Sequence, residues 1–207
     1  FTLTALGLQV VVNVSAFKPA ELSPVTLKGF VEANGYVSME AAHFANNLAA
    51  VGNEWIEVED FGHTLSGMRA TATSDAPPLT PGKDAPCLEY RMYLFSTGQV
   101  AVNPYVAPTL NFLPGRPVRY AIAFDNQEPQ VVTLVPENFD AMNGNREWEE
   151  SVSNNYRVGM STHDITSAGY HTLKIWMVDP GVVLQKIVVN TGGVKPSYLG
   201  PPESFYN

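Results

Sequence analysis

Four acids in one short stretch, Glu54, Glu57, Glu59 and Asp60, are the side chains best suited to chemistry by type and spacing. A glycosidase needs two carboxylates roughly 5–10 Å apart. Glu57 and Glu59 would share one face of a strand, because successive side chains alternate between its two faces. The same pair suits a calcium ion or a solvent-exposed face. We favour the exposed face, since Asp and Glu are rarely buried.

Nucleophiles and zinc ligands do not form a recognisable pattern. Residues 62–67 place a serine before a glycine, but a nucleophile elbow needs Gly where Thr64 stands, so a serine hydrolase is not indicated. The histidines lack the spacing that puts two zinc ligands on one face. Hydrogen-bonded structural roles are expected for the last two of them. The four are His43, His63, His163 and His171.

Calcium remains an open alternative, because Asp, Glu and Asn are abundant hard oxygen ligands. The spacing of a contiguous calcium loop is absent, so an ion would need Glu40 together with a backbone carbonyl and a distant acid. No cofactor is otherwise required. Cys87 is the only cysteine, which excludes an internal disulfide, and we expect it to be a small buried side chain.

Aromatic rings beside planar amides are the strongest indication of a ligand. Sugars pack their C–H-rich faces on Trp and Tyr rings, and their hydroxyls bond to Asn, Gln and Asp. Residues 142–156 have this composition and are rich in turn-forming types. Packing of Trp148 as a lid on the core is the competing interpretation. The predicted carbohydrate contacts are Trp148, Tyr156, Asn154, Asn155, Trp55 and Tyr105.

Charge and hydropathy exclude several classes of partner. The chain has 207 residues, a formal net charge of −8 and a pI near 4.9. Nucleic acids and anionic membranes attract clustered Lys and Arg, which this sequence lacks. No apolar run approaches the ~20 residues of a membrane span. A neutral polysaccharide meets no such electrostatic objection.

Turn signals about every ten residues predict an all-β protein, an antiparallel β-sandwich or jelly roll with about ten strands. The turn at residues 179–181 predicts that the strands on either side form a hairpin. Trp176, on the most clearly alternating strand, is expected in the core. Only residues 41–51 and 147–155 could hold a short helix. Strands are predicted at 36–41, 55–61, 68–73, 88–95, 99–106, 118–124, 130–135, 157–160, 170–178 and 182–189.

The sequence divides into three parts. Residues 1–34 contain a β-branched strand and a proline-interrupted stretch, which predicts an N-terminal extended arm. Residues 35–193 form the predicted sandwich, and 194–207 a C-terminal tail. We interpret the chain as a fragment of a longer protein.

Several motifs resemble glycoside hydrolase family 115, whose members are xylan α-1,2-glucuronidases, over about residues 35–204. They are GYVSMEAAHF at 35–44, TLSGM at 64–68, YLFSTG at 93–98, PTLNFLP at 108–114, GYHTLKIWMVDPG at 169–181, QKIVV at 185–189 and PSYLGPPES at 196–204. The resemblance is to the family's C-terminal β-sandwich domain. It implies a galactose-binding-like jelly roll similar to carbohydrate-binding modules, with the catalytic carboxylates in earlier domains. Some relatives hold calcium between the first and last strands, where this chain offers Glu40 and Gln185.

Together these features predict a non-catalytic, secreted or periplasmic module that binds xylan or glucuronoxylan beside the catalytic domains of its parent enzyme. The alternative is a structural domain, or a homodimerisation domain, that binds no sugar independently. Retention on polysaccharides and light scattering would separate the two.

Overall fold

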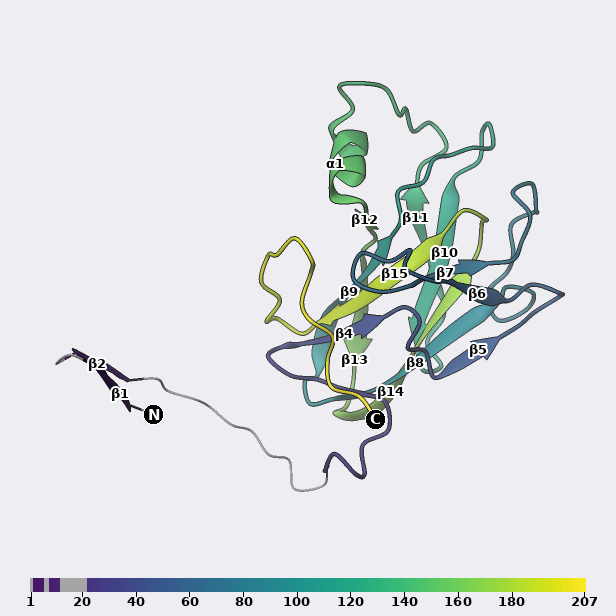
Figure 1. The fold of residues 1–207 in the computed structure, drawn as a ribbon. Coiled ribbons are helices and arrows are strands. Elements are labelled where there is room, and N and C mark those ends of the chain that lie inside the picture. Colours follow the sequence, from purple (N-terminus) through teal and green to yellow (C-terminus); the bar gives the residue numbers. More distant parts are fainter. Residues whose placement is uncertain (1, 6–7, 12–21) are drawn as a thin grey trace.

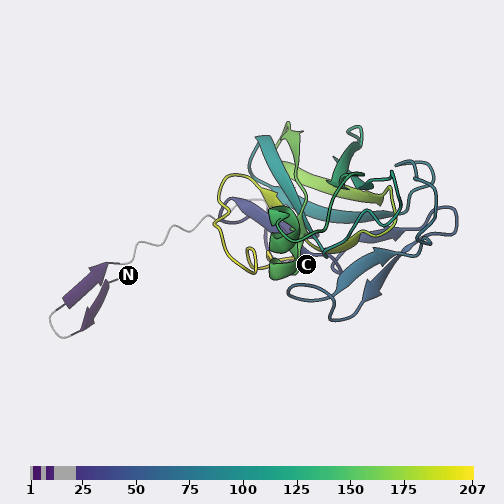
Figure 2. The ribbon, with the colours of Figure 1, turned by 90° about the horizontal axis from the view of Figure 1, so that it is seen from above.

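The computed structural model describes residues 2–5, 8–11 and 22–207, so part of the predicted arm lies outside the described residues. Two facing sheets and one helix make up the body (Figures 1 and 2). The elements are β1 Thr2–Ala5, β2 Leu8–Val11, β3 Phe30–Val31, β4 Tyr36–Glu40, β5 Asn46–Leu48, β6 Trp55–Val58, β7 Gly67–Ala70, β8 Cys87–Leu94, β9 Gly98–Val106, β10 Val118–Phe124, β11 Gln130–Val135, α1 Arg146–Asn154, β12 Arg157–Val158, β13 Ser161–Ile165, β14 Gly169–Met177 and β15 Val183–Asn190.

The six-stranded sheet has the order β11-β10-β14-β8-β3, with β5 also paired to β8. The seven-stranded sheet has the order β12-β9-β15-β7-β6, with β13 on β9 and β4 on β15. Pairing within both sheets is antiparallel except between β3 and β8. β1 and β2 pair with each other. The predicted all-β sandwich is confirmed, with more strands than the ten expected.

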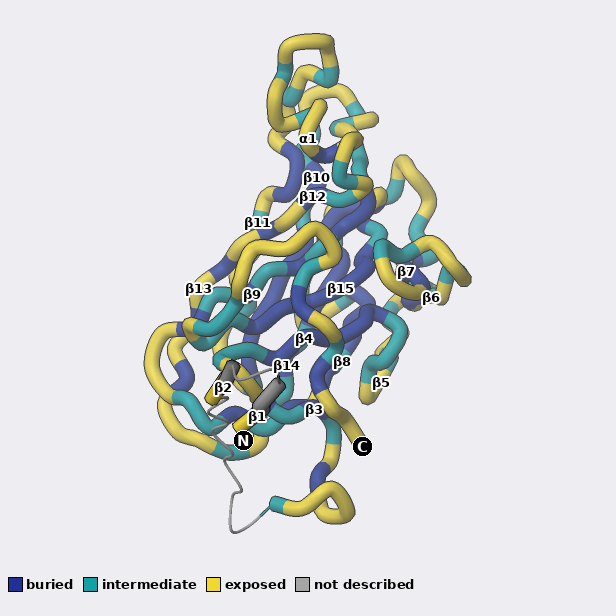
Figure 3. Tube along the Cα trace, turned by 60° about the vertical axis from the view of Figure 1, so that its left-hand side comes forward, coloured by how far each residue is buried: buried dark blue, intermediate teal, exposed yellow. Residues whose placement is uncertain are grey.

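The main core lies between the sheets and is built from alternate residues of their strands (Figure 3). On β14, Leu173, Ile175 and Met177 face this core. Trp176 therefore points to the opposite face, where it is buried in a second, smaller cluster with Cys87 and neighbouring alanines. Trp176 and Cys87 are buried as expected, but outside the main core.

The predicted hairpin of β14 and β15 is wrong, because the two strands belong to different sheets. β14 is flanked by β10 and β8, and β15 by β9 on one side and β4 and β7 on the other, so neither has a free edge for the other. Residues 179–181 instead carry the chain across the sandwich. Buried Asp179 is held there by Arg116 at 2.9 Å and Arg119 at 2.6 Å.

Short strands account for the other differences. β3 lies inside the predicted arm, β5 replaces the helix considered for residues 41–51, and β13 was not predicted. The C-terminal tail joins the body through Ser204, whose N–H donates to Ser38 O at 2.8 Å. Among the described residues, no helix is long and apolar enough to cross a membrane.

Candidate functional site

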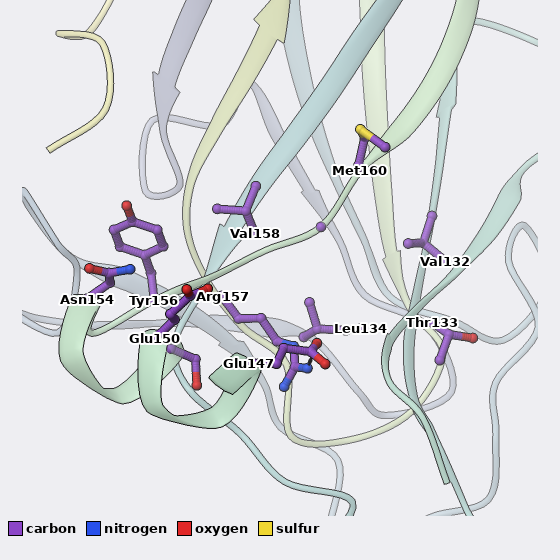
Figure 4. A pocket seen from close by; sticks show the side chains of 12 residues that line it. Val132, Thr133, Leu134, Glu147, Glu150, Asn154, Tyr156, Arg157, Val158 and Met160 are labelled. Carbon is purple, nitrogen blue, oxygen red and sulfur yellow. Dashed lines mark hydrogen bonds and ion pairs between the residues drawn. The ribbon is translucent and has the colours of Figure 1, made fainter. Parts of the chain in front are cut away.

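An open pocket of about 380 Å³ lies where the edges of the two sheets meet α1, and we call it the α1 pocket. Figure 4 shows side chains from α1 on one side, from β11 on the other, and from the segment 156–160 between them. Its lining combines aliphatic, aromatic and acidic groups. The lining residues are Val132, Thr133, Leu134, Glu147, Glu150, Ser151, Asn154, Tyr156, Arg157, Val158, Gly159 and Met160.

The local sequence fixes both ends of α1. Asn145 is the N-cap, and its Oδ1 accepts from the N–H groups of Glu147 at 3.1 Å and Trp148 at 3.3 Å. Asn155 ends the helix in the left-handed conformation with φ 58°, and its N–H donates to Val152 O. Asn155, predicted as a sugar contact, is thus an exposed helix cap outside the pocket lining.

Arg157 forms one wall of the pocket and was not predicted from the sequence. Its side chain is 6% exposed, with the guanidinium carbon 4.5 Å from the centre of the Phe139 ring. Nη2 donates to Glu147 Oε1, whereas Nη1 is buried without a hydrogen-bond partner. Burial lowers the pKa of Arg157 from its ordinary value. An alternating strand pattern gives no signal for such a buried cation.

Two predicted contacts, Asn154 and Tyr156, lie together in the pocket lining. The half-buried Tyr156 ring also packs 5.0 Å from both Tyr105 and His63, centre to centre. Tyr105 is half-buried behind it, outside the lining, and burial raises its pKa. Trp148 is half-buried on the same helix, 6.4 Å from Phe139, and does not line the pocket either.

Trp55 is wrongly assigned as a carbohydrate contact. Its side chain is 1% exposed in the main core, and its indole N–H donates to Pro86 O at 3.1 Å. Because both its face and its polar atom are used internally, the ring has no surface to offer a ligand. From the sequence alone, a tryptophan at the start of a strand is equally compatible with a buried and with an exposed position.

Gly159 lets a core tyrosine approach the pocket wall. A Cβ on Gly159 would lie 2.1 Å from Tyr120 Oη, so only glycine fits here. The Tyr120 hydroxyl is buried without a hydrogen-bond partner, and burial raises its pKa well above the usual range. An unpaired buried hydroxyl is destabilising.

Residues 29–203 match the model of the glycosyl hydrolase family 115 C-terminal domain. The chain belongs to this family. No curated protein matched the chain in the corresponding comparison. The solved structures that resemble it include a family 115 4-O-methyl-α-glucuronidase described as specific for decorated arabinogalactans, at 18% identity and a TM-score of 0.50. That alignment covers 86% of this chain and 19% of the other, so the chain spans about a fifth of that protein.

Two isolated binding modules also resemble this family 115 domain. One is the C-terminal family 6 module of a laminarinase from Zobellia galactanivorans, with 11% identity, a TM-score of 0.45 and coverage of 75% of this chain and 98% of that one. The other is a family 35 carbohydrate-binding module from Clostridium thermocellum, with 13% identity, a TM-score of 0.46 and coverage of 74% and 97%.

Among the described residues of the family 115 domain, one pair of Ser and His side chains is hydrogen-bonded. Ser161 Oγ and His163 Nε2 lie 2.9 Å apart. Gln130 Nε2 lies 3.3 Å from His163 Nδ1, and an amide N–H can only donate there. With Nδ1 accepting from Gln130, Nε2 is left as the donor to Ser161, which suits a structural pair better than a general base. Burial also lowers the pKa of His163. This pair is structural, as expected for His163.

The acids of residues 54–60 are exposed, which agrees with the exposed-face interpretation. His171 bridges Asp125 at 2.7 Å and Ser167 O at 2.9 Å, a structural role. Within the described residues, no three His, Cys, Asp or Glu side chains gather as a metal site.

Glu40 does not fit the calcium site considered above. The ammonium of Lys186 lies 3.1 Å from Glu40 Oε1, and the two side chains are 3% and 7% exposed. Thr64 Oγ1 donates to the same oxygen at 2.6 Å. Glu40 Oε2 and Gln185 Oε1 are buried oxygens without partners, but calcium would need several more ligands and would lie beside a positive charge. The lysine already neutralises this carboxylate.

Proposed function

We propose that this chain is a non-catalytic carbohydrate-binding domain of a family 115 enzyme, and that it holds xylan or glucuronoxylan in the α1 pocket. One observation carries the proposal: Asn154 and Tyr156, both predicted as sugar contacts, line one open cavity together with two carboxylates and an aliphatic wall. That combination suits a pyranose ring.

The pocket offers each part of a sugar a different partner. The Tyr156 ring and the aliphatic side chains of Val158 and Met160, which are 42% and 68% exposed, provide apolar surface for C–H groups. The amide of Asn154 can donate and accept, and the carboxylates accept, so hydroxyls find partners at the pocket rim.

A binding domain assists catalysis by proximity. Tethering the polysaccharide near a catalytic domain raises its effective concentration without any chemistry in the tether. The proposal therefore assigns reaction chemistry to other domains of the parent enzyme. It also implies a secreted or periplasmic protein, since cell-wall polysaccharides lie outside the cell.

Affinity electrophoresis and calorimetry with xylan, glucuronoxylan, arabinoxylan and cellulose test this proposal. Asn154→Ala should weaken binding about fivefold, because one hydrogen bond contributes about 1 kcal/mol. Tyr156→Ala should weaken it about tenfold through loss of the aromatic contact. Asn126→Ala, in the turn between β10 and β11 outside the pocket lining, is the matched control and should bind normally. The absence of retention on every polysaccharide would refute the proposal.

A structural or dimerisation role is the second candidate, favoured by an exposed apolar patch. Phe61, Leu65, Tyr198 and Leu199 are 39–59% exposed, and His63 joins the two segments by contacting Tyr198 O at 3.1 Å. Exposed apolar clusters often mark protein contacts. A dimer in light scattering that dissociates on Phe61→Ser would support this role, and a monomer at all concentrations would count against self-association.

A further inference from the structure

The charged groups of the α1 pocket decide which sugars it can accept. The carboxylates of Glu147 and Glu150 are 61% and 56% exposed, so a ligand meets them directly. The buried cation Arg157 is only 6% exposed. The side of the pocket formed by α1 therefore presents hydrogen-bond acceptors to a ligand.

Every positive charge beside the pocket already has a partner. Arg157 Nη2 donates to Glu147 Oε1. Arg146 Nε donates to Glu150 Oε1 at 2.6 Å, and its side chain is 88% exposed to screening by water. Among the described residues, no hydrogen bond reaches Oε2 of either acid. A ligand carboxylate would gain no unpaired cation and would lie close to two like charges.

Hydroxyl groups match the same wall. A hydroxyl can donate to the remaining carboxylate oxygens, Oε2 of Glu147 and of Glu150. Arg157 Nη1 is buried, so it favours neither a hydroxyl nor a carboxylate. A carboxylate can only accept, and removing its charge from water without a partner is unfavourable.

We infer that the α1 pocket selects a neutral, hydroxyl-bearing sugar and discriminates against a uronic acid. This inference rests on the proposed carbohydrate-binding function and specifies its ligand. A domain with this preference binds the undecorated backbone of a polysaccharide. The acidic side groups then remain accessible to the other domains of the parent enzyme.

Calorimetry with two probes tests the inference: a linear xylo-oligosaccharide, and the same backbone carrying one glucuronic acid on every second xylose. The neutral probe should bind at least about fivefold more tightly at low salt, the effect of ~1 kcal/mol of repulsion between exposed like charges. Raising the salt to about 0.5 M should narrow the difference, because the screening length falls below 5 Å. The affinity of the neutral probe should barely change.

Glu150→Gln is the diagnostic variant. This substitution removes one negative charge from the pocket. The only ion pair lost is the exposed one between Glu150 and Arg146, so the fold should be retained. The preference for the neutral probe should fall to about twofold, since half of the repelling charge is gone. Glu149→Gln is the matched control, with the same charge change on the same helix outside the pocket lining, and should keep more of the preference.

The outcomes separate the two proposals. Tighter binding of the decorated probe, or a preference unchanged in Glu150→Gln, overturns the charge-based selection while sugar binding stands. If neither probe binds, the proposed function itself fails and the inference with it.

Discussion

Removing the Lys186 ammonium should be among the most destabilising single substitutions in this domain. Lys186→Met leaves the buried Glu40 carboxylate without its counter-charge. Loss of one partner of a buried ion pair costs about 3–5 kcal/mol. Thr64 still donates to Glu40 at 2.6 Å, so we expect the lower end, about 3 kcal/mol. The lysine also anchors the tail by donating to Leu199 O and Pro201 O, both at 3.4 Å.

Urea unfolding followed by tryptophan fluorescence measures this loss, and a Tm lowered by about 6–12 °C should accompany it in a domain of this size. The double variant Glu40→Gln with Lys186→Met should recover part of the stability, because it buries no charge. A chelator should leave the wild-type Tm unchanged, since Lys186 supplies the positive charge. A Lys186→Met variant within 1 kcal/mol of wild type, or a double variant no more stable than the single one, would refute this account of the pair.

Two further predictions concern stability. Gly159→Ala should lower the unfolding free energy by about 2 kcal/mol, because the new methyl group overpacks against Tyr120. Adding Tyr120→Phe should restore part of the lost stability in a double-mutant cycle. Strictly additive changes in unfolding free energy would contradict a clash between the two side chains. Burial opposes ionisation of Glu32, but hydrogen bonds from Ser96, Thr191 and the Phe95 N–H outweigh it and lower the pKa of Glu32 overall. The ionised carboxylate therefore stabilises the fold at neutral pH, and this contribution is lost as pH falls through the folded-state pKa, which lies below 4.5. Acid titration of stability should therefore be shallower in Glu32→Gln, and an unchanged profile would show that Glu32 contributes nothing to it.

The sequence predicted the local elements of the body well. Residues 118–124 and 130–135 are strands over the predicted ranges, and α1 covers residues 146–154. The alternation of apolar and polar residues in strands and the capping of helices depend on residues that are close in the sequence, so a single sequence is enough to predict them. Asn154 and Tyr156 could be grouped together for the same reason, since Asn154 ends α1 and Tyr156 follows two positions later, and both line the α1 pocket.

Pairing and burial depend on residues far apart in the chain, and only the tertiary structure decided them. The turn at Asp179 suits a hairpin or a crossing equally, and the crossing follows because both edges of β14 and β15 are occupied. The sequence allowed Trp55 to face solvent, but in the fold it is enclosed by Pro86 and the second sheet. Arg157 lies in the pocket wall because it contacts Glu147 of α1 and the ring of Phe139, which are distant from it in the local strand pattern. The sequence by itself determined which segments extend and what chemistry they carry, whereas the fold determined which side chains remain exposed to use it, because exposure depends on packing between distant segments.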